Sequence, residues 1–372
     1  DNVKPVPVLI TQSRTTGTNR LDQSTRSSPS KFREDHPAEW EANMRFNRRI
    51  IIAGSAVALT MAAAMGAEAQ ERTLRFAHHL PTASEQHIAA ERFAERVSAI
   101  TNGALAVEIL PAGQMGGQRE IIESVQLGTL DMGYGESGLY ANYVPAFGIL
   151  SLPYLYGSEE HWTKVVDGEI GSGLADQLAG QANIKVLNWI LAGYRDTYLA
   201  EKPINAPADF EGVKIRVPES PVFIETFAAL GAQPTPVPGP EMYTALQTRL
   251  VDAMEGTPEV AVTYKIFEVA NYGSKTRHIL FDGSFAINND LFNGLPADQQ
   301  EAILSAAQEV AEQQRAERAE RENGWFEQLA ELGMNLNEVD TGPFQEALVP
   351  VQDAFAEKAG ATELLAEIRA AQ

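Results

Sequence analysis

Along residues 73–134, segments with the two-residue hydrophobic period of a β-strand alternate with segments that have the period of an α-helix. This alternation restricts the fold more than any other feature of the sequence. Three short segments alternate apolar and polar residues, as half-buried β-strands do, and the segments between them carry apolar residues at helical spacing. We expect strands at 73–78, 105–110 and 130–134, with helices at 82–101 and 118–126. Strands and helices in this order require parallel strands joined by crossovers, so the predicted fold class is α/β.

The ends of these helices are also marked. Thr82-Ala83-Ser84-Glu85 resembles a capping box at the start of the first helix. Asn102-Gly103 closes that helix, and the second stops near Gly128.

A second α/β cycle follows after residue 184. The sequence predicts strands at 185–190 and 213–217 and helices at 221–230 and 241–248. Gly231 and a Pro-rich turn at 234–240 separate the two helices. No internal repeat is found in the sequence.

The last distinctive element is a long helix from Asp298 to about Leu332. It follows Pro296, a favourable residue for a first turn, and is dense in Ala, Glu, Gln and Arg. At 1.5 Å per residue it would be roughly 50 Å long, more than the width of one small domain. Two readings fit: one helix that spans two domains, kinked near Asn323-Gly324, or two separate helices.

Composition narrows the functional classes. The chain has 372 residues, enough for two domains, since one core usually stops growing near ~250–300 residues. It has no cysteine, which excludes disulfides, thiolate metal sites and cysteine nucleophiles and suits an oxidising compartment. Its net charge of −21 argues against nucleic acid or an anionic membrane surface as partner.

An internal segment has the order of a secretory signal. Met44–Arg49 is basic, Ile50–Met65 is apolar, and Ala67-Glu68-Ala69 is a small-x-small cleavage site. We expect residues 44–69 to be a signal peptide cut after Ala69, and the protein to be periplasmic. A membrane anchor or a buried helix is the alternative, but the apolar run is short for a span of ~20 residues. The export route, general secretion or twin-arginine, is open.

Residues 1–43 lack apolar periodicity and are rich in Ser, Thr and Arg. We interpret them as a non-native, disordered extension upstream of a start at Met44. The mature chain is not expected to insert in a membrane.

Motifs of enzymes are weak in this sequence. Residues 133–138 match the dinucleotide pattern GxGxxG, but residues 139–153 show no helical face to hold a pyrophosphate. Gly135-Glu136-Ser137 begins a nucleophile elbow, yet Leu139 replaces the second glycine. No HExxH pair occurs, and His78 and His79 point to opposite faces if both are in a strand. We predict no catalytic residue, no metal site and no cofactor.

Arg195 and Arg216 are the basic residues of most interest. Arg216 lies in Lys214-Ile215-Arg216-Val217-Pro218, at the C-terminal end of a predicted strand, where open α/β sheets bind ligands. A guanidinium offers a carboxylate a fixed fork of donors. By spacing alone, a solvated arginine at a strand end is the alternative reading.

Four segments, in order and without large gaps, resemble the substrate-binding subunit of tripartite ATP-independent periplasmic (TRAP) transporters. The resemblance covers essentially all of residues 71–372, and 212–258 is its most specific part. The segments are FAHHLPTASEQHIAAERFAERVSAITNG (76–103), ILPAGQMGGQREIIESVQLGTLDMG (109–133), GYRDTYLAEKPINAPADFEGVKIRVP (193–218) and GAQPTPVPGPEMYTALQTRLVDAMEGTP (231–258).

The resemblance implies a periplasmic-binding-protein type II-like fold. Its two α/β lobes would be joined by hinge strands, crossed by one long helix, and able to close over an organic acid. Placed on this sequence, lobe I would comprise 70–193 with 282–321, and lobe II 194–281 with 322–372.

The resemblance also implies site residues. Arg216 is similar to the arginine that pairs with the ligand carboxylate, and Arg195 to a second basic contact. Glu136 resembles a pocket acid that bonds ligand hydroxyls or amines. His79 and Gln118 fall where polar contacts from the first lobe are expected.

Two positions depart from the family pattern. Sugar-acid and sialic-acid binders resemble DGQENP where this chain reads DAMEGTP at 252–258, so Gly256 removes an amide that would reach the ligand. Gly239 stands where an aromatic residue is often found. Both departures leave the identity of the acid open and weaken the case for sialic acid.

The predicted function is therefore a periplasmic solute-binding protein, not an enzyme. It would capture a small organic carboxylate by hinge closure and deliver it to the small and large membrane subunits of a TRAP permease. A ligand-sensing partner of a membrane receptor and a periplasmic hydrolase on the same scaffold are the alternatives. The sequence leaves open the acid, a metal ion that assists binding, and the choice of monomer or dimer.

Overall fold

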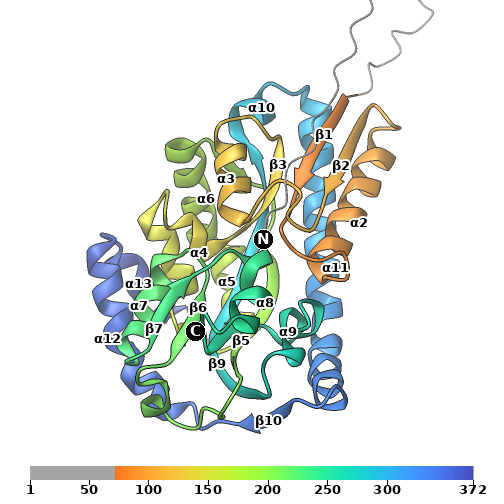
Figure 1. Cartoon of the computed structure of the whole chain (residues 1–372). Coiled ribbons are helices and arrows are strands. Elements are labelled where there is room, and N and C mark those ends of the chain that lie inside the picture. The colour runs from red at the N-terminus through yellow and green to blue at the C-terminus, as the bar shows by residue number, and fades with distance from the viewer. Residues whose placement is uncertain (1–71, 372) are drawn as a thin grey trace, which may run out of the picture. The chain divides into compact units, whose positions relative to one another are not determined.

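The computed structural model describes residues 72–371, which are coloured in Figure 1. The predicted upstream extension (1–43) and signal peptide (44–69) lie outside the described residues, so both stay predictions. Between residues 72 and 371, no helix combines the length and the hydrophobicity that crossing a bilayer requires.

The described strands form one mixed ten-stranded sheet. Its hydrogen-bonded order is β2-β1-β3-β9-β5-β8-β6-β7, and β4 and β10 also pair with β9. The strands are β1 (Arg72–Ala77), β2 (Leu105–Leu110), β3 (Met132–Glu136), β4 (Ile184–Val186), β5 (Ile190–Leu199), β6 (Lys214–Val217), β7 (Gln233–Pro236), β8 (Ala253–Gly256), β9 (Tyr272–Asn288) and β10 (Asn335–Glu338).

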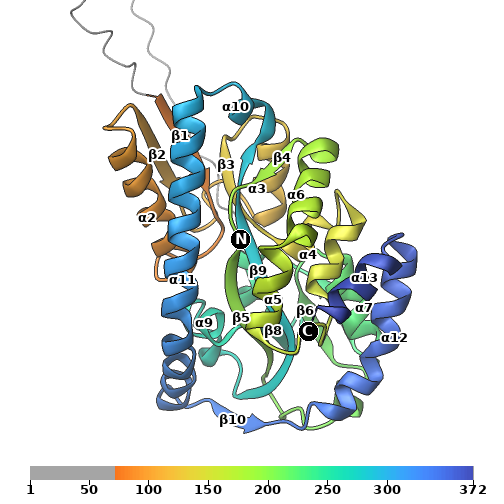
Figure 2. The ribbon, with the colours of Figure 1, turned by 180° about the vertical axis from the view of Figure 1, so that it is seen from behind.

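Helices cover this sheet, with α2 beside α11 and α12 beside α7 (Figures 1 and 2). The α-helices are α2 (Glu85–Ile100), α3 (Gln118–Gln126), α4 (Ser137–Tyr140), α5 (Glu159–Val166), α6 (Glu169–Ala182), α7 (Pro221–Ala229), α8 (Met242–Gln247), α9 (Pro258–Thr263), α10 (Asn289–Asn293), α11 (Ala297–Glu331), α12 (Gly342–Lys358) and α13 (Thr362–Ala370). Short 3₁₀ helices are η1 (Pro145–Ser151), η2 (Pro207–Phe210), η3 (Gly239–Glu241) and η4 (Ile266–Glu268).

The predicted α/β class is confirmed by two blocks of parallel strands. β1 pairs in parallel with β2 and β3, and β6 pairs in parallel with β7 and β8. The predicted strand 105–110 and helix 118–126 have the bounds of β2 and α3, and β3 begins two residues later than predicted.

The start of α2 differs from the prediction. The N-cap is Ser84 rather than Thr82, and its hydroxyl oxygen accepts a hydrogen bond from the His87 backbone N–H at 3.2 Å. A serine oxygen can satisfy one of the otherwise unpaired amides of the first turn, and either residue has the chemistry to do so. The turn before the helix decides which one does.

The prediction of one continuous strand over residues 185–190 was wrong. The segment is divided between β4 and β5 because the Asn188 side chain takes over backbone pairing at the break. Asn188 Oδ1 accepts from the Phe285 N–H at 2.9 Å, and its Nδ2 donates to the Ala307 carbonyl at 2.9 Å. Both strand pieces still pair with β9.

The Pro-rich stretch at 234–240 is only partly a turn. Pro234 and Pro236 lie in β7, the last strand of the sheet order, which pairs only with β6 among the described strands. Proline lacks the backbone donor and is tolerated at a sheet edge, where the outward side needs no partner.

The central strand β9 was not predicted from the sequence. It is 17 residues long and pairs antiparallel with β3, β4 and β5 and in parallel with β10. It therefore joins the two parallel blocks into one sheet, as the hinge strands implied by the family resemblance would.

A single helix, α11, is confirmed over the long Ala-rich segment. It extends for 35 residues and packs against α2, α9 and β5, elements from both parts of the fold (Figure 2). The fold class is thus the predicted two-lobed α/β arrangement crossed by a long helix. The lobe boundaries placed on the sequence stay predictions.

One aromatic cluster holds β1, α2 and β9 together. The Phe285 ring centroid lies 4.9 Å from that of Phe76 and 5.6 Å from that of Phe93, and all three side chains are fully buried. Such edge-to-face contacts add to the burial of a large apolar surface.

We expect Phe285→Ala to lower the free energy of unfolding by about 3–5 kcal/mol, because it leaves a cavity in a closed core. Urea denaturation measures the loss. Leu127→Ala, at a side chain that is 75% exposed, is the control and should change stability by less than about 0.5 kcal/mol. A loss below about 1 kcal/mol for Phe285→Ala would contradict the assigned core.

Candidate functional site

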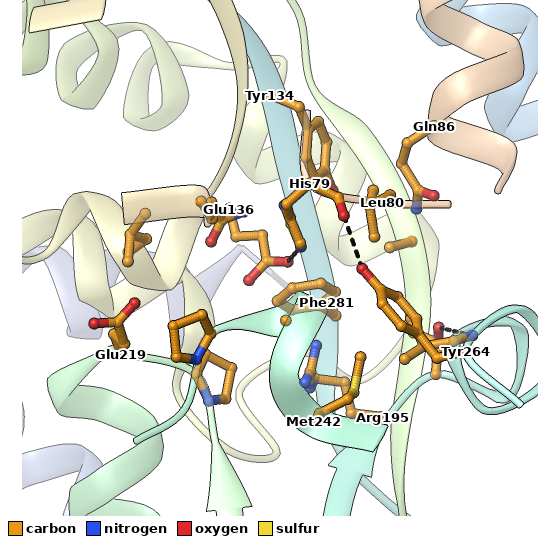
Figure 3. Close-up of a pocket in the computed structure, with 18 of the residues that line it drawn as sticks. His79, Leu80, Gln86, Tyr134, Glu136, Arg195, Glu219, Met242, Tyr264 and Phe281 are labelled. Atoms are coloured by element: carbon orange, nitrogen blue, oxygen red, sulfur yellow. Dashed lines mark hydrogen bonds and ion pairs between the residues drawn. The ribbon is translucent and has the colours of Figure 1, made fainter. Parts of the chain in front are cut away.

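A cavity lies where the carboxyl ends of β1, β3 and β6 meet, the place at which open α/β sheets bind ligands. It encloses about 600 Å³ outside the protein atoms, part of which is open to solvent. Figure 3 shows its polar side chains converging from opposite sides. The lining residues are His79, Leu80, Gln86, Gln118, Tyr134, Glu136, Leu139, Ala192, Arg195, Arg216, Pro218, Glu219, Pro238, Gly239, Met242, Thr257, Val260, Tyr264 and Phe281.

Arg216 lines this cavity with a guanidinium that has almost no protein partner. It lies on β6, where its sequence neighbours Ile215 and Val217 are fully buried, and only 5% of Arg216 itself is exposed. Its Nε donates to the Val237 carbonyl at 2.8 Å, and its terminal nitrogens make no hydrogen bond or ion pair within residues 72–371. Burial lowers the pKa of Arg216, yet a guanidinium stays charged near neutral pH. The cavity therefore holds an unpaired cationic fork.

Arg195, by contrast, is already paired. It projects from β5 and forms a two-pronged ion pair with Glu255 of β8, through Nε–Oε2 and through Nη2–Oε1 at 2.7 Å. Its guanidinium also lies 4.1 Å from the Phe281 ring centroid. Burial alone would raise the pKa of Glu255, but Arg195 and the nearby His278 lower it to about 2. The charge of Arg195 is thus neutralised inside the protein.

His79 and Glu136 face each other in the cavity without forming an ion pair. Their Nε2 and Oε1 atoms are 3.8 Å apart, longer than a hydrogen bond (Figure 3). Burial raises the pKa of Glu136 to about 7 and lowers the pKa of His79 to about 3. The imidazole is therefore neutral, and the carboxyl group is largely protonated below pH 7.

The side chains of the adjacent histidines His78 and His79 were expected to point to opposite sides, and they do. His79 lines the cavity, whereas His78 Nε2 lies 2.9 Å from His87 Nδ1 on the other side, beneath α2. No cluster of three His, Cys, Asp or Glu side chains suited to a metal ion occurs in the part of the chain that the structure describes.

Three further polar groups of the cavity wall have no hydrogen-bond partner among residues 72–371. They are the Gln118 amide nitrogen, the Gln86 amide oxygen and the Tyr134 hydroxyl, and all three residues are buried. Buried polar groups are normally satisfied, so an unpaired set around a cavity indicates a polar ligand or water. Donors and acceptors stand side by side here, as a hydroxyl-bearing ligand requires.

The sequence reasoning named Gln118 but missed Gln86, Tyr134 and Tyr264. Tyr264 donates its hydroxyl hydrogen to the His79 carbonyl oxygen at 3.0 Å and so closes one side of the cavity (Figure 3). Tyr134 could have been found, because it precedes Glu136 by two residues and therefore points to the same face of β3. Gln86 and Tyr264 belong to helix ends whose direction only the fold supplies.

The two glycines that depart from the family pattern have different surroundings. A Cβ at Gly239 would lie 2.6 Å from His79 Cδ2, so an aromatic side chain there requires the imidazole to move. Gly256 is not among the residues that line the cavity; a Cβ there would meet Met254 Cε at 2.8 Å. Six of the seven predicted binding residues thus lie around one cavity, with Gly256 behind its wall.

The glycines of the GxGxxG match are explained by packing. A Cβ at Gly133 would lie 2.7 Å from Ile121 Cγ2, and one at Gly138 would lie 2.8 Å from Phe223 Cε2. The helix that follows, α4, has four residues. Close side-chain contacts, rather than a pyrophosphate, therefore account for the small residues in this loop.

Comparison with known proteins identifies the family. The sequence profile of the bacterial extracellular solute-binding proteins, family 7, matches residues 76–359. The chain belongs to this family.

Family members with known ligands resemble the chain over most of its length. The 2,3-diketo-L-gulonate-binding periplasmic protein of Escherichia coli (strain K12) is 34% identical over 286 residues, covering 76% of this chain and 87% of that protein. A TRAP periplasmic solute-binding protein from Roseobacter denitrificans with bound β-D-glucuronate is 34% identical, with a TM-score of 0.77, covering 80% and 99%. The sugar acid binding protein from Advenella mimigardefordensis in complex with galactonate is 27% identical, with a TM-score of 0.78, covering 82% and 99%.

These family relationships confirm the predicted resemblance to TRAP substrate-binding subunits. The three relatives described above are named as binding proteins and not as enzymes. The roles of the individual cavity residues of this solute-binding protein stay predictions.

The raised pKa of Glu136 predicts a pH-dependent contribution to stability. The unfolded chain releases this proton near pH 4.5, whereas the folded chain keeps it to about pH 7. In this window the unfolded state binds fewer protons, so the contribution of Glu136 to stability falls as pH rises. His79 acts in the opposite sense between about pH 3 and its ordinary value of 6.5.

We expect the Glu136→Gln variant to gain stability over the wild type as pH rises from 5 to 8, by about 3 kcal/mol. The His79 contribution is common to both proteins and cancels in the difference. Urea denaturation without ligand at several pH values measures it, and Glu95→Gln, at an exposed site on α2, is the control that should parallel the wild type. A difference that does not change with pH would mean that Glu136 is ionised throughout.

Proposed function

We propose that the protein is a periplasmic solute-binding protein that captures a sugar acid, of the uronate or aldonate class, for a TRAP permease. The relatives with bound β-D-glucuronate and galactonate support this ligand class. The polar but mostly uncharged wall of the cavity supports it as well. The unpaired guanidinium of Arg216 is the observation that carries the proposal.

The ligand carboxylate would bind Arg216. The hydrogen bond from its Nε to the Val237 carbonyl orients the guanidinium and leaves both terminal nitrogens available to a ligand. A planar fork of donors in a buried setting matches a carboxylate better than a lysine would. The buried Arg195–Glu255 pair would form the cavity wall beside Arg216 and would not bind the ligand carboxylate.

The hydroxyl groups of the ligand would bind the unpaired polar atoms of the wall. Gln118 supplies an amide donor, Gln86 an amide acceptor, and the Tyr134 hydroxyl can do both. Below about pH 7 the protonated Glu136 adds an O–H donor and a carbonyl acceptor. A polyhydroxylated chain can satisfy these groups together, whereas an apolar acid would leave them unpaired at a cost in affinity.

Hinge closure would bring these contacts together. Arg216 and Arg195 belong to the segment assigned to lobe II, and His79, Gln118 and Glu136 to the segment assigned to lobe I. A ligand that binds both sets favours the closed form by the contacts that only this form makes. The proposed lobes, 70–193 with 282–321 and 194–281 with 322–372, place the cavity between them.

A binding role is supported over an enzymatic one. Thr257 lines the cavity and carries a hydroxyl group that could be considered as a nucleophile. This hydroxyl accepts a hydrogen bond from the Val260 N–H at the start of α9, so its role is that of a helix cap. The cavity imidazole, His79, contacts a carboxyl group and no hydroxyl nucleophile. A sensing role for a membrane receptor would use the same cavity, and the family's transporter relatives favour transport. The family supports a periplasmic location and delivery to the two permease subunits as parts of this proposal.

We expect Arg216→Ala to weaken binding of the preferred acid by a factor of tens to thousands, since truncating one partner of a buried charged pair costs about 2–5 kcal/mol. Isothermal titration of protein refolded to strip bound ligand, against uronates, aldonates, C4-dicarboxylates and 2-oxo acids, provides the reference affinity. Arg216→Lys should be intermediate, because it keeps the charge and loses the fork.

Arg96→Ala is the control, at an exposed arginine of α2 that pairs with Glu309 at 2.7 Å, far from the cavity lining. It should bind as the wild type does. If Arg216→Ala retained wild-type affinity while well folded, the carboxylate would have another partner. If no acid bound the wild type, the proposed ligand class would be wrong.

A further inference from the structure

The charged groups around the cavity nearly neutralise one another, and this balance limits the negative charge that a ligand can carry. Arg195 is neutralised by Glu255, with two contacts between their polar ends. Glu219, which also lines the cavity, lies 3.8 Å from Arg119 of α3, an exposed arginine whose Nε also donates to Glu123 at 3.0 Å, so two carboxylates share this cation. Of the two arginines that line the cavity, only Arg216 forms no ion pair within residues 72–371.

The other titratable groups of the wall carry no positive charge. Burial holds the pKa of His79 at about 3, so its imidazole is neutral at physiological pH. Burial also lowers the pKa of His278, which lies 3.4 Å from Glu255 behind the wall. Tyr134 and Tyr264 are neutral phenols, since burial raises the pKa of each. Glu136 can add negative charge but not positive.

We infer that the cavity selects acids with a single carboxylate and rejects dicarboxylates of the same length and stereochemistry. This inference rests on the proposed function, because it takes Arg216 to be the carboxylate site. One ligand carboxylate uses the only unpaired cation. A second carboxylate would lie against uncharged amides and hydroxyls, or beside Glu136.

The wall available to a second carboxylate is unfavourable for two reasons. The Gln86 amide oxygen can only accept hydrogen bonds, and the Glu136 carboxyl group, with a pKa of about 7, is partly ionised at pH 7.5, so both oppose a second carboxylate. The donors that remain, Gln118 Nε2 and the Tyr134 hydroxyl, suit a hydroxyl group equally well. A buried anion without a counter-charge is costly, whereas a buried hydroxyl needs only hydrogen bonds.

Galactonate and galactarate form a matched pair for the test, because they differ only in one terminal CH₂OH, which is a carboxylate in galactarate. We expect galactarate to bind about 100-fold more weakly than galactonate at pH 7.5, by isothermal titration of the same protein preparation. Gluconate with glucarate is a second pair of the same kind. It is used if the stereochemistry of galactonate does not suit the cavity.

A second cation should relax the discrimination. Gln118→Lys places an ammonium group at the wall and should raise the affinity for the dicarboxylate relative to the monocarboxylate at least about tenfold. Gln118→Met, of similar length and uncharged, is the matched control: it removes the amide donor for both acids and should not raise the affinity for the dicarboxylate relative to the monocarboxylate. If Gln118→Lys fails to fold, Met242→Lys with Met242→Gln replaces the pair, since Met242 lines the same cavity.

The outcomes separate this inference from the proposed function. Equal affinity of the wild type for both members of a pair would overturn the single-carboxylate inference and leave the sugar-acid function intact. Binding of neither member of either pair, nor of any uronate, would overturn both. An unchanged ratio in the lysine variants would show that something other than charge excludes the second carboxylate, and would also overturn the inference.

Discussion

The antiparallel pairing of β5 with β9 is the contact on which the rest of the structure depends. Each of the two parallel blocks, β2-β1-β3 and β8-β6-β7, would by itself be a small sheet with an open edge. β9 closes one edge through β3, and β5 closes the other through β8. Because the two long strands pair with each other, both blocks share one sheet, and their carboxyl ends meet at the cavity.

The same pairing decides how the two buried arginines differ. Arg195 lies on β5, opposite Ile279 of β9 and close to the β8 strand that carries Glu255. A carboxylate is therefore built into the position next to it, and its positive charge stays inside the protein. Arg216 lies on β6, two strands from β5 in the sheet order, and the acceptor of its only side-chain hydrogen bond within residues 72–371 is the Val237 backbone carbonyl. A buried arginine with a neutral partner is costly unless a ligand supplies the anion, so this position is suited to binding.

Local patterns predicted the local structure well and the long-range pairings poorly. β2 and α3 alternate or repeat cleanly in sequence, and both were predicted with their observed bounds. The strand at 185–190 was predicted as continuous because nothing in its pattern shows that the Asn188 side chain bonds Phe285 and Ala307, residues about one hundred positions away. β9 is buried along most of its length, so it lacks the alternation that marks a half-buried strand.

For the candidate site as well, the residues themselves could be predicted, but the contacts that depend on strand pairing could not. The family resemblance named Arg216, Arg195, Glu136, His79, Gln118 and Gly239, all of which line one cavity. It could not indicate that Glu255 neutralises Arg195, since that depends on the register of β5 with β8. Gly256 was assigned to the cavity from its place in a motif, but its neighbours, Met254 and Val260, fill the space toward which a side chain would point.

The net charge of −21 and an anionic ligand are compatible because the two act over different distances. Charges in solvent are screened beyond roughly 8–10 Å in ordinary salt, so the summed field affects the rate of encounter more than the affinity. Inside the cavity the effective dielectric constant is lower, so the charges of the cavity wall act on a ligand more strongly than surface charges do. There Glu255 is paired with Arg195, Glu219 lies 3.8 Å from Arg119, and Glu136 is kept largely protonated below pH 7 by burial. The local field at Arg216 is therefore positive within an acidic protein, and the number of charges that it can neutralise is one.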